Sequence, residues 1–498
     1  MTEPCDLTAL EARRLIGRRK LSPVELLESC LKRIGEVNHA VNAVVALDED
    51  RARVAAKEAE AAVMRGDELG PLHGLPIGIK DLEETEGLRT TYGSPIFRDF
   101  VPDADCGMVA NLRANGAIIT GKTNTPEFGA GANTRNAVYG VTGNPFDPMK
   151  SAAGSSGGSG VALATNMFPI CSGSDTGGSL RNPAAFNGIV GYRPSPGLVP
   201  SEKRAHGWSG LPVLGPMARN VADVCLLLSA MASDDGRDPL AYTLHDGYVR
   251  EEPSLYFPVP RYDLASLRLA FSPDFGMAPT ENHIREIFAD RAGAIAPMFG
   301  AAEAAHPDCA GGDEAFEVLR AAGFLTSHLE KCRTRPQDVG PNVRANVEEG
   351  LRYSLDDYAR AAAAQTKMYR AWQGFFAAHD VLITPAITIS PRPWKELYPA
   401  EIDGKPTRTY FHWLALAYYP TLCGHPAISI PMGVDRNGMP FGLQVVGPRG
   451  GDRLVLGVAA AIEEAFAGDA ARCRPVPDLA KLKAAKPVKD MPGAVGWD

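Results

Sequence analysis

The 498-residue chain has few of the features that mark metalloproteins, secreted proteins or nucleic-acid-binding proteins. Its nine cysteines are an odd number, scattered without a CxxC pair, so we expect neither a disulfide framework nor a zinc site. Its ten histidines form no HxxxH or HExxH spacing, and we expect no metal and no cofactor. The formal net charge is −8 and no run of Lys and Arg resembles a nucleic-acid-binding tract, which argues against nucleic-acid binding.

The sequence also lacks the hydrophobic segments of membrane and exported proteins. No stretch of 18 apolar residues occurs, and the N-terminal residues have neither the basic nor the apolar region of a signal peptide. We therefore expect a cytoplasmic protein with reduced thiols and no membrane partner. With 45% hydrophobic and 22% charged residues, the composition is that of a globular protein with a sizeable core. A small molecule is the default partner, and a homodimer is compatible with the sequence.

The most informative stretch covers residues 151–183 and reads SAAGSSGGSGVALATNMFPICSGSDTGGSLRNP. It sets Ser155 and Ser179 among glycines, which allow tight turns and close backbone approach to a ligand. Such turns present a hydroxyl and neighbouring N–H groups as a nucleophile beside an oxyanion hole requires. A flexible linker is the alternative. The apolar run between the serines, and the charges of Asp175 and Arg181, are not linker composition.

Lys80 ends a segment, HGLPIGIK, whose alternating apolar residues predict a short strand. An isolated lysine is usually solvated. At the end of this apolar run, however, we expect Lys80 to be partly buried. Burial lowers the pKa of a lysine, which is how such a residue becomes a base near neutral pH.

A second glycine-containing segment, GAIITGKT at 116–123, matches the phosphate-binding pattern GxxxxGK[ST]. We reject ATP or GTP binding at this segment. The pattern requires a strand before the first glycine and a helix after the lysine, whereas the sequence predicts a helix over 105–115 and a strand in place of the loop.

Helical and strand patterns alternate along the whole chain, which favours a layered α/β fold around one large sheet. Paired helices are expected between residues 21 and 63, and further helices over 157–166, 284–299, 354–378 and 452–466. Strands are expected over 167–171, 189–192, 267–271, 381–384, 427–431 and 441–446. The looser composition over 233–313 suggests a variable region that shapes a substrate pocket.

Five segments, in this order and spacing, resemble the amidase signature enzymes over nearly the whole chain. They are HGLPIGIKD at 73–81, GSSGG at 154–158, GSDTGGSLRNP at 173–183, and PAISIPMG with GMPFGLQVVG near the C-terminus. The family usually has Pro and Gly where this chain has Ala152 and Ala153, for which we expect a small adjustment of the loop. The resemblance implies a large central mixed β-sheet flanked by helices on both faces.

The resemblance also implies that residues 1–498 form a single amidase domain. We expect N-terminal helices over about 1–70, the signature core over about 71–230 and a variable substrate-pocket region over about 231–380. The C-terminal core strands and helix then cover about 381–470, and a peripheral tail covers 471–498.

The resemblance implies a Ser–Ser–Lys triad, with Ser179 as the acylated nucleophile, Ser155 as the bridging serine and Lys80 as the base. The chemistry of the residues agrees with these roles. A serine hydroxyl is a weak nucleophile and needs an adjacent base. The chain offers no well-placed histidine, and a lysine acting through a second hydroxyl is a known variant of the serine triad.

Other residues of the same motifs are expected to support the triad. The resemblance implies an oxyanion hole made from the backbone N–H groups of Thr176, Gly177, Gly178 and Ser179. It also implies that three further side chains orient the site, namely Ser156, Asp175 and Arg181. A plain surface ion pair is the alternative for the last two.

The expected function is hydrolysis of the C–N bond of a linear amide through an acyl-enzyme, giving a carboxylate and ammonia or an amine. One alternative is the glutaminase subunit of a tRNA-dependent amidotransferase, which segment 341–378 does not closely resemble. The other is a catalytically silent binding protein of the same fold, against which the presence of Lys80, Ser155 and Ser179 argues. The substrate stays open among aryl, aliphatic, urea-type and peptide amides.

Overall fold

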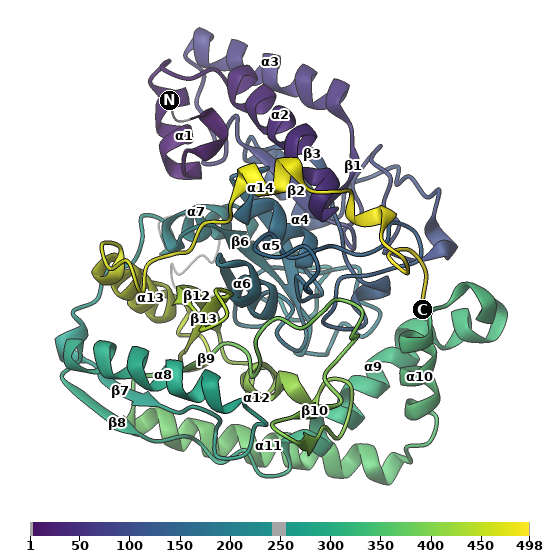
Figure 1. Ribbon diagram of the computed structural model, residues 1–498, viewed down its shortest axis with the longest axis vertical. Helices are drawn as coiled ribbons and strands as arrows, with labels where there is room; N and C mark the ends of the chain where they lie inside the picture. The colour runs from purple at the N-terminus through teal and green to yellow at the C-terminus, as the bar shows by residue number, and fades with distance from the viewer. Residues whose placement is uncertain (1–2, 242–254, 498) are drawn as a thin grey trace.

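One mixed β-sheet of 11 strands organises the protein, as the resemblance implied (Figure 1). The structure is a computed structural model, and it describes residues 3–241 and 255–497. Residues 242–254, which belong to the expected variable region, lie outside the described residues, as do residues 1–2 and 498 at the ends of the expected N-terminal helices and tail. The order of the strands is β1-β3-β2-β4-β6-β5-β12-β13-β9-β7-β8.

The strands of this sheet are β1 (Val44–Leu47), β2 (Pro76–Lys80), β3 (Ile118–Thr123), β4 (Ile170–Asp175), β5 (Val190–Arg193), β6 (Val213–Ala218), β7 (Arg268–Phe271), β8 (Ala301–Ala304), β9 (Val381–Pro385), β12 (Ala427–Val434) and β13 (Pro440–Val446). A separate hairpin joins β10 (Glu401–Ile402) to β11 (Lys405–Pro406). In the large sheet β2 is parallel to β3 and β4, whereas β4, β6, β5, β12, β13 and β9 pair antiparallel in turn.

The helices of the described residues are α1 (Ala9–Gly17), α2 (Pro23–Val41), α3 (Glu49–Arg65), α4 (Gly107–Ala114), α5 (Gly157–Ala164), α6 (Arg181–Asn187), α7 (Val221–Met231), α8 (Asn282–Ile295), α9 (Gly312–Thr334), α10 (Pro341–Gly350), α11 (Leu355–Ala378), α12 (Ala415–Leu422), α13 (Asp452–Phe466) and α14 (Leu479–Ala484). In Figure 1, α1–α3 lie at one end of the molecule and α9–α11 at the other. None of these helices is long and apolar enough to cross a membrane.

Helices cover both faces of the sheet because its central strands are buried on both sides. In β2, Ile77 and Ile79 belong to a hydrophobic cluster that includes residues of α4 and α7. The alternate residues Gly78 and Lys80 face the other way, since a β-carbon at Gly78 would lie 2.7 Å from the ring of Phe168. Phe168 belongs to the cluster that includes α2 and α5. Lys80 therefore points toward α5.

Most of the expected elements are present, and the differences among the strands have a common cause. The strand expected over 167–171 is β4, which begins at Ile170 and continues to Asp175 because its whole length pairs with β6. β6 itself, and β1 between the two N-terminal helices, were not predicted. These strands are fixed by pairing with distant segments, which local composition does not record.

We expected the C-terminal tail to be peripheral. It crosses the outside of the molecule and packs against it (Figure 1). Leu482, Val488 and Ala494 are each at most 1% exposed. The carbonyl of Ala494 also accepts a hydrogen bond from the N–H of Val141, at 2.8 Å. The tail therefore helps to cover the loops around residue 141.

Candidate active site

Lys80 lies at the carboxyl end of β2 and is completely buried, so the solvated alternative is wrong. Its Nζ donates hydrogen bonds to three serine hydroxyls: Ser155 at 2.7 Å, Ser156 at 2.9 Å and Ser174 at 2.9 Å. Its backbone N–H donates to the hydroxyl of Ser172, at 3.0 Å. The amine is thus surrounded by hydroxyl groups, which can accept a hydrogen bond from an ammonium group and donate one to a neutral amine.

Burial lowers the pKa of Lys80 to about 7, although the negative charges of Glu83 and Asp175 act in the opposite direction. The three hydroxyl partners of Nζ carry no charge that could hold the ammonium form. About half of such lysines are neutral at pH 7, which is the state that a general base needs. The environment of Lys80 therefore has the properties that the sequence led us to expect.

The two serine-containing turns pack against each other, and the first of them contacts Lys80. Ser155 is 3% exposed and directly precedes Ser156, the N-cap residue of α5. The backbone N–H of Ser156 donates to the carbonyl of Ser179, at 3.2 Å, so the second turn lies against the first. Ser179 is half-buried. The linker alternative is wrong, because nearly every residue from 151 to 183 is buried.

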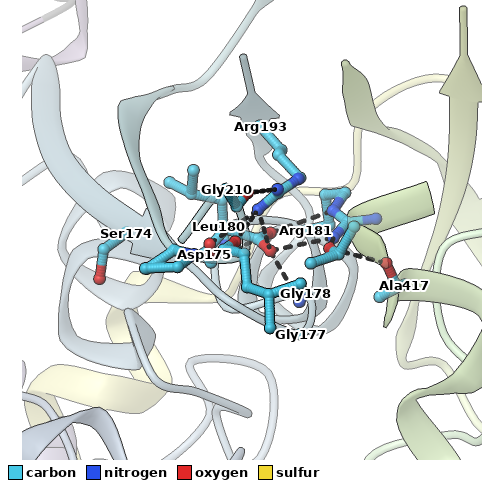
Figure 2. Close-up of polar contacts among 12 residues, drawn as sticks. Ser174, Asp175, Gly177, Gly178, Leu180, Arg181, Arg193, Gly210 and Ala417 are labelled. Carbon is cyan, nitrogen blue, oxygen red and sulfur yellow. Dashed lines mark hydrogen bonds and ion pairs between the residues drawn. The ribbon is translucent and has the colours of Figure 1, made fainter. Parts of the chain in front are cut away.

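The carboxylate of Asp175 holds the turn that carries Ser179 (Figure 2). One of its oxygens accepts the N–H of Gly178 at 2.8 Å, and the other accepts the N–H of Leu180 at 3.2 Å. These two amides lie immediately before and after Ser179. Gly178 has a φ of +102°, and a β-carbon there would lie 2.5 Å from that of Ala417, so the turn requires glycine.

This arrangement corrects one member of the expected oxyanion hole. The N–H of Gly178 is donated to Asp175 and is not free to bind an oxyanion. The turn conformation explains the difference, because the amide of Gly178 points inward to the carboxylate. The N–H groups of Thr176, Gly177 and Ser179 stay as the predicted donors.

Two buried arginines neutralise Asp175. The guanidinium of Arg181 donates to both carboxylate oxygens, at 3.0 and 2.9 Å, and that of Arg193 donates to the Asp175 carbonyl at 2.8 Å (Figure 2). Burial alone would raise the pKa of Asp175, but the charges of Arg181 and Arg193 outweigh it and lower this pKa to about 2. All three side chains are inaccessible to solvent, so the surface-pair alternative is wrong.

Sequence reasoning missed Ser174 and Arg193. Ser172 and Ser174 are alternate residues of β4, and both contact Lys80. Their period of two could have indicated a shared face if the strand had been recognised through Asp175. No residue pattern around Arg193 indicated its role in the sequence, because Arg193 reaches Asp175 only through the pairing of β5 with the rest of the sheet.

The rejected phosphate-binding pattern lies in β3, with α4 before it. Its lysine, Lys122, is completely buried and donates to the hydroxyl of Thr85 at 3.0 Å and to the carbonyl of Glu83. Lys122 therefore holds the loop that follows Lys80 in place through hydrogen bonds. Because the segment is a strand, the rejection of a phosphate-binding loop is confirmed.

A cavity of about 250 Å³ lies beside both serine turns. Its walls include Thr176, three residues before Ser179, and Gly129, where a β-carbon would lie 3.3 Å from the Ser155 hydroxyl. Several residues of α9 also line it: Leu319, Arg320, Gly323, Phe324, Ser327 and His328. The cavity therefore lies next to the turns that carry Ser155 and Ser179.

A family model described as amidase matches residues 25–456. The chain belongs to the amidase signature family. Proteins of this family are amidohydrolases, so this amidase hydrolyses carboxamide C–N bonds.

Two known relatives cover nearly all of this amidase. An acylamidase of Rhodococcus erythropolis is 32% identical over 460 residues, which are 92% of this chain and 95% of the relative. A glutamyl-tRNA(Gln) amidotransferase subunit of Thermus thermophilus is 35% identical over 482 residues, 93% of this chain and 98% of the relative. The crystal structure of a bacterial aryl acylamidase of the amidase signature family has a TM-score of 0.83 at 24% identity, covers 92% of this chain and 96% of its own, and shows the same fold.

Proposed function

We propose that this amidase uses Ser179 as nucleophile, Ser155 as proton relay and Lys80 as general base to hydrolyse linear amides as a free-standing chain. The observation that carries the proposal is the 2.7 Å hydrogen bond between a completely buried Lys80 and Ser155. A buried amine in contact with a serine is an arrangement suited to proton removal and has little use as a structural ion pair.

The steps follow from these positions. Neutral Lys80 accepts the proton of Ser155, and Ser155 accepts that of Ser179 as the Ser179 oxygen attacks the amide carbon. The oxyanion that forms takes hydrogen bonds from backbone N–H groups of the turn, for which Thr176 and Gly177 are candidates beside Ser179. The proton then passes back to the leaving nitrogen, the C–N bond breaks, and an acyl ester stays on Ser179.

Deacylation uses the same groups in the same order. Water attacks the ester carbon while Ser155 and Lys80 remove its proton, and the Ser179 oxygen leaves with a proton returned by Ser155. The products are a carboxylate and ammonia or an amine, and the free enzyme is restored.

A fluorophosphonate tests the assignment of the nucleophile, because it forms a covalent bond only with an activated serine. We expect labelling of Ser179 in the native chain and none in Ser179→Ala, whose melting temperature should be unchanged since the hydroxyl is only half-buried. A label that maps to another serine, or an active Ser179→Ala variant, would refute it.

The second candidate is a glutaminase subunit, which the 35% identity to an amidotransferase subunit favours. Ammonia release by the purified chain separates the two candidates. We expect release from simple amides at a higher kcat/KM than from glutamine. Activity with glutamine alone, and only after two other subunits are added, would support the second candidate.

We also propose a cytoplasmic location. All nine cysteines are free thiols, and seven of them are buried. Free thiols in this number are typical of a reducing compartment.

A further inference from the structure

The cavity beside the serine turns has an aromatic wall. The ring of His328 lies 4.6 Å from that of Phe128 and 5.4 Å from that of Phe324, measured between ring centroids. All three residues line the cavity. Burial lowers the pKa of His328 to about 3, so its imidazole is neutral at pH 7. The wall therefore offers three uncharged rings, which favour an aromatic group by offset or edge contacts.

The charges around the cavity are positive. Arg204 and Arg320 line it, and no carboxylate is among its described lining residues. Arg204 is held by both oxygens of the buried Asp238 carboxylate, at 2.6 and 2.7 Å. Arg320 donates to two uncharged partners, Asn346 and the hydroxyl of Tyr410. A substrate group with its own positive charge would meet this cavity without a counter-charge, which disfavours it.

Gly323 is part of the cavity wall that α9 provides. It lies in the interior of that helix and lines the cavity, and a β-carbon built on it would meet nothing within 4 Å. Glycine is a poor residue for a helix interior, where alanine is better by about 1 kcal/mol. A side chain at this position would extend into free space and reduce the room for a ligand.

We infer that this cavity binds the aromatic group of an uncharged amide, and that Gly323 determines how large that group can be. The inference rests on the proposed function, because the cavity is the one beside Ser155 and Thr176. Its volume of about 250 Å³ is sufficient. A buried apolar cavity of roughly 150 Å³ binds benzene, so a ring and a short linker fit.

The first measurement compares kcat/KM for matched substrates. 3-Phenylpropanamide is compared with propanamide, and acetanilide with acetamide, so that the ring is tested on either side of the scissile bond. We expect the ring to raise kcat/KM about tenfold or more in at least one pair, as burial of a phenyl group allows. Phenylalanine amide adds an α-ammonium group to 3-phenylpropanamide, and we expect it to react at least about tenfold more slowly.

The second measurement uses Gly323→Leu, with Gly374→Leu as the matched control. Gly374 lies in the interior of α11, does not line the cavity, and also has nothing within 4 Å of its β-carbon position. We expect Gly323→Leu to lower the preference for the ring, measured as the ratio of kcat/KM within each pair, about tenfold or more. Gly374→Leu should leave this ratio unchanged. Gly323→Ala should act in the same direction with a smaller effect if the leucine variant does not fold.

The outcomes separate the two proposals. Hydrolysis of the small amides without a preference for the ring, or a preference that Gly323→Leu and Gly323→Ala both leave unchanged, would overturn the inference alone. Equal rates for phenylalanine amide and 3-phenylpropanamide would overturn the part that concerns charge. A native chain that hydrolyses none of these amides and takes no fluorophosphonate label would overturn both.

Discussion

Replacement of Lys80 by methionine tests the chemical role of the buried amine. Methionine keeps the length and apolar stem of the lysine but has no base. With a pKa of about 7, Lys80 is half neutral at pH 7. A lysine with the ordinary pKa of about 10.4 would be neutral only about once in 2,500 molecules at that pH. Burial therefore increases the fraction of Lys80 that is neutral at pH 7 about 10³-fold.

The pH dependence follows from the same value. Because the active form is the neutral amine, kcat/KM should fall as the pH drops below the pKa of Lys80, about 7. It should be about 100-fold lower at pH 5 than on the alkaline plateau, which corresponds to tenfold per pH unit. Lys80→Met should lose this dependence and about 10²–10⁴-fold in rate, the usual contribution of a general base.

The assay is the rate of acylation by a fluorophosphonate, or kcat/KM with an uncharged amide, from pH 5 to 9. Lys122→Met is the control, because Lys122 is equally buried but donates to Thr85 and Glu83 and makes no bond to Ser155. Lys122→Met should still show the fall in rate below about pH 7, even if the variant is less stable. A native profile that is flat below pH 8, or a Lys80→Met variant with the native limb, would refute the role of Lys80.

The structure also predicts the direction in which three further substitutions change the rate, the pH dependence or the stability. Ser155→Ala should lose acylation about 10²-fold or more, measured by the labelling rate, because the relay between Lys80 and Ser179 is broken. Glu83→Gln should move the pH limb to lower pH, because the charge of Glu83 raises the pKa of Lys80. Arg181→Met should lower the free energy of unfolding by about 3 kcal/mol in urea titrations, because it leaves a buried carboxylate with one partner fewer.

Each of these predictions can be contradicted by a stated result, and the third also has a control variant. An upward shift of the limb in Glu83→Gln, or native labelling of Ser155→Ala, would contradict the first two. For the third, Arg237→Met removes an exposed ion pair with Asp235 and should leave the unfolding free energy nearly unchanged. Equal losses in Arg181→Met and Arg237→Met would show that burial of the pair does not matter.

Asp175 also links stability to pH. Its pKa in the folded protein, about 2, is below the unfolded value of about 3.9. The carboxylate therefore stabilises the fold fully above about pH 5 and loses that contribution as the pH falls toward 2. Urea titrations of the native chain at pH 6 and pH 3 should differ by more than those of Asp175→Asn.

The sequence by itself determined the parts of the site that depend on neighbours along the chain. The apolar residues before Lys80 were enough to predict a strand that buries it. The glycines around Ser155 and Ser179 were enough to predict turns, since their backbone conformations are a local property. Motifs in a fixed order then identified the family, and the resemblance implied the mixed sheet.

Tertiary structure decided what surrounds those residues. Ser174 reaches Lys80 because β4 pairs with β6 as far as Asp175, and Arg193 reaches Asp175 from another strand. Arg181 also donates to Gln444, which is 263 residues away in the sequence. Gly323 lines the cavity because α9, far along the chain, packs beside the serine turns. Such contacts depend on which distant segments pair and pack, and residue patterns within one segment carry little information about this.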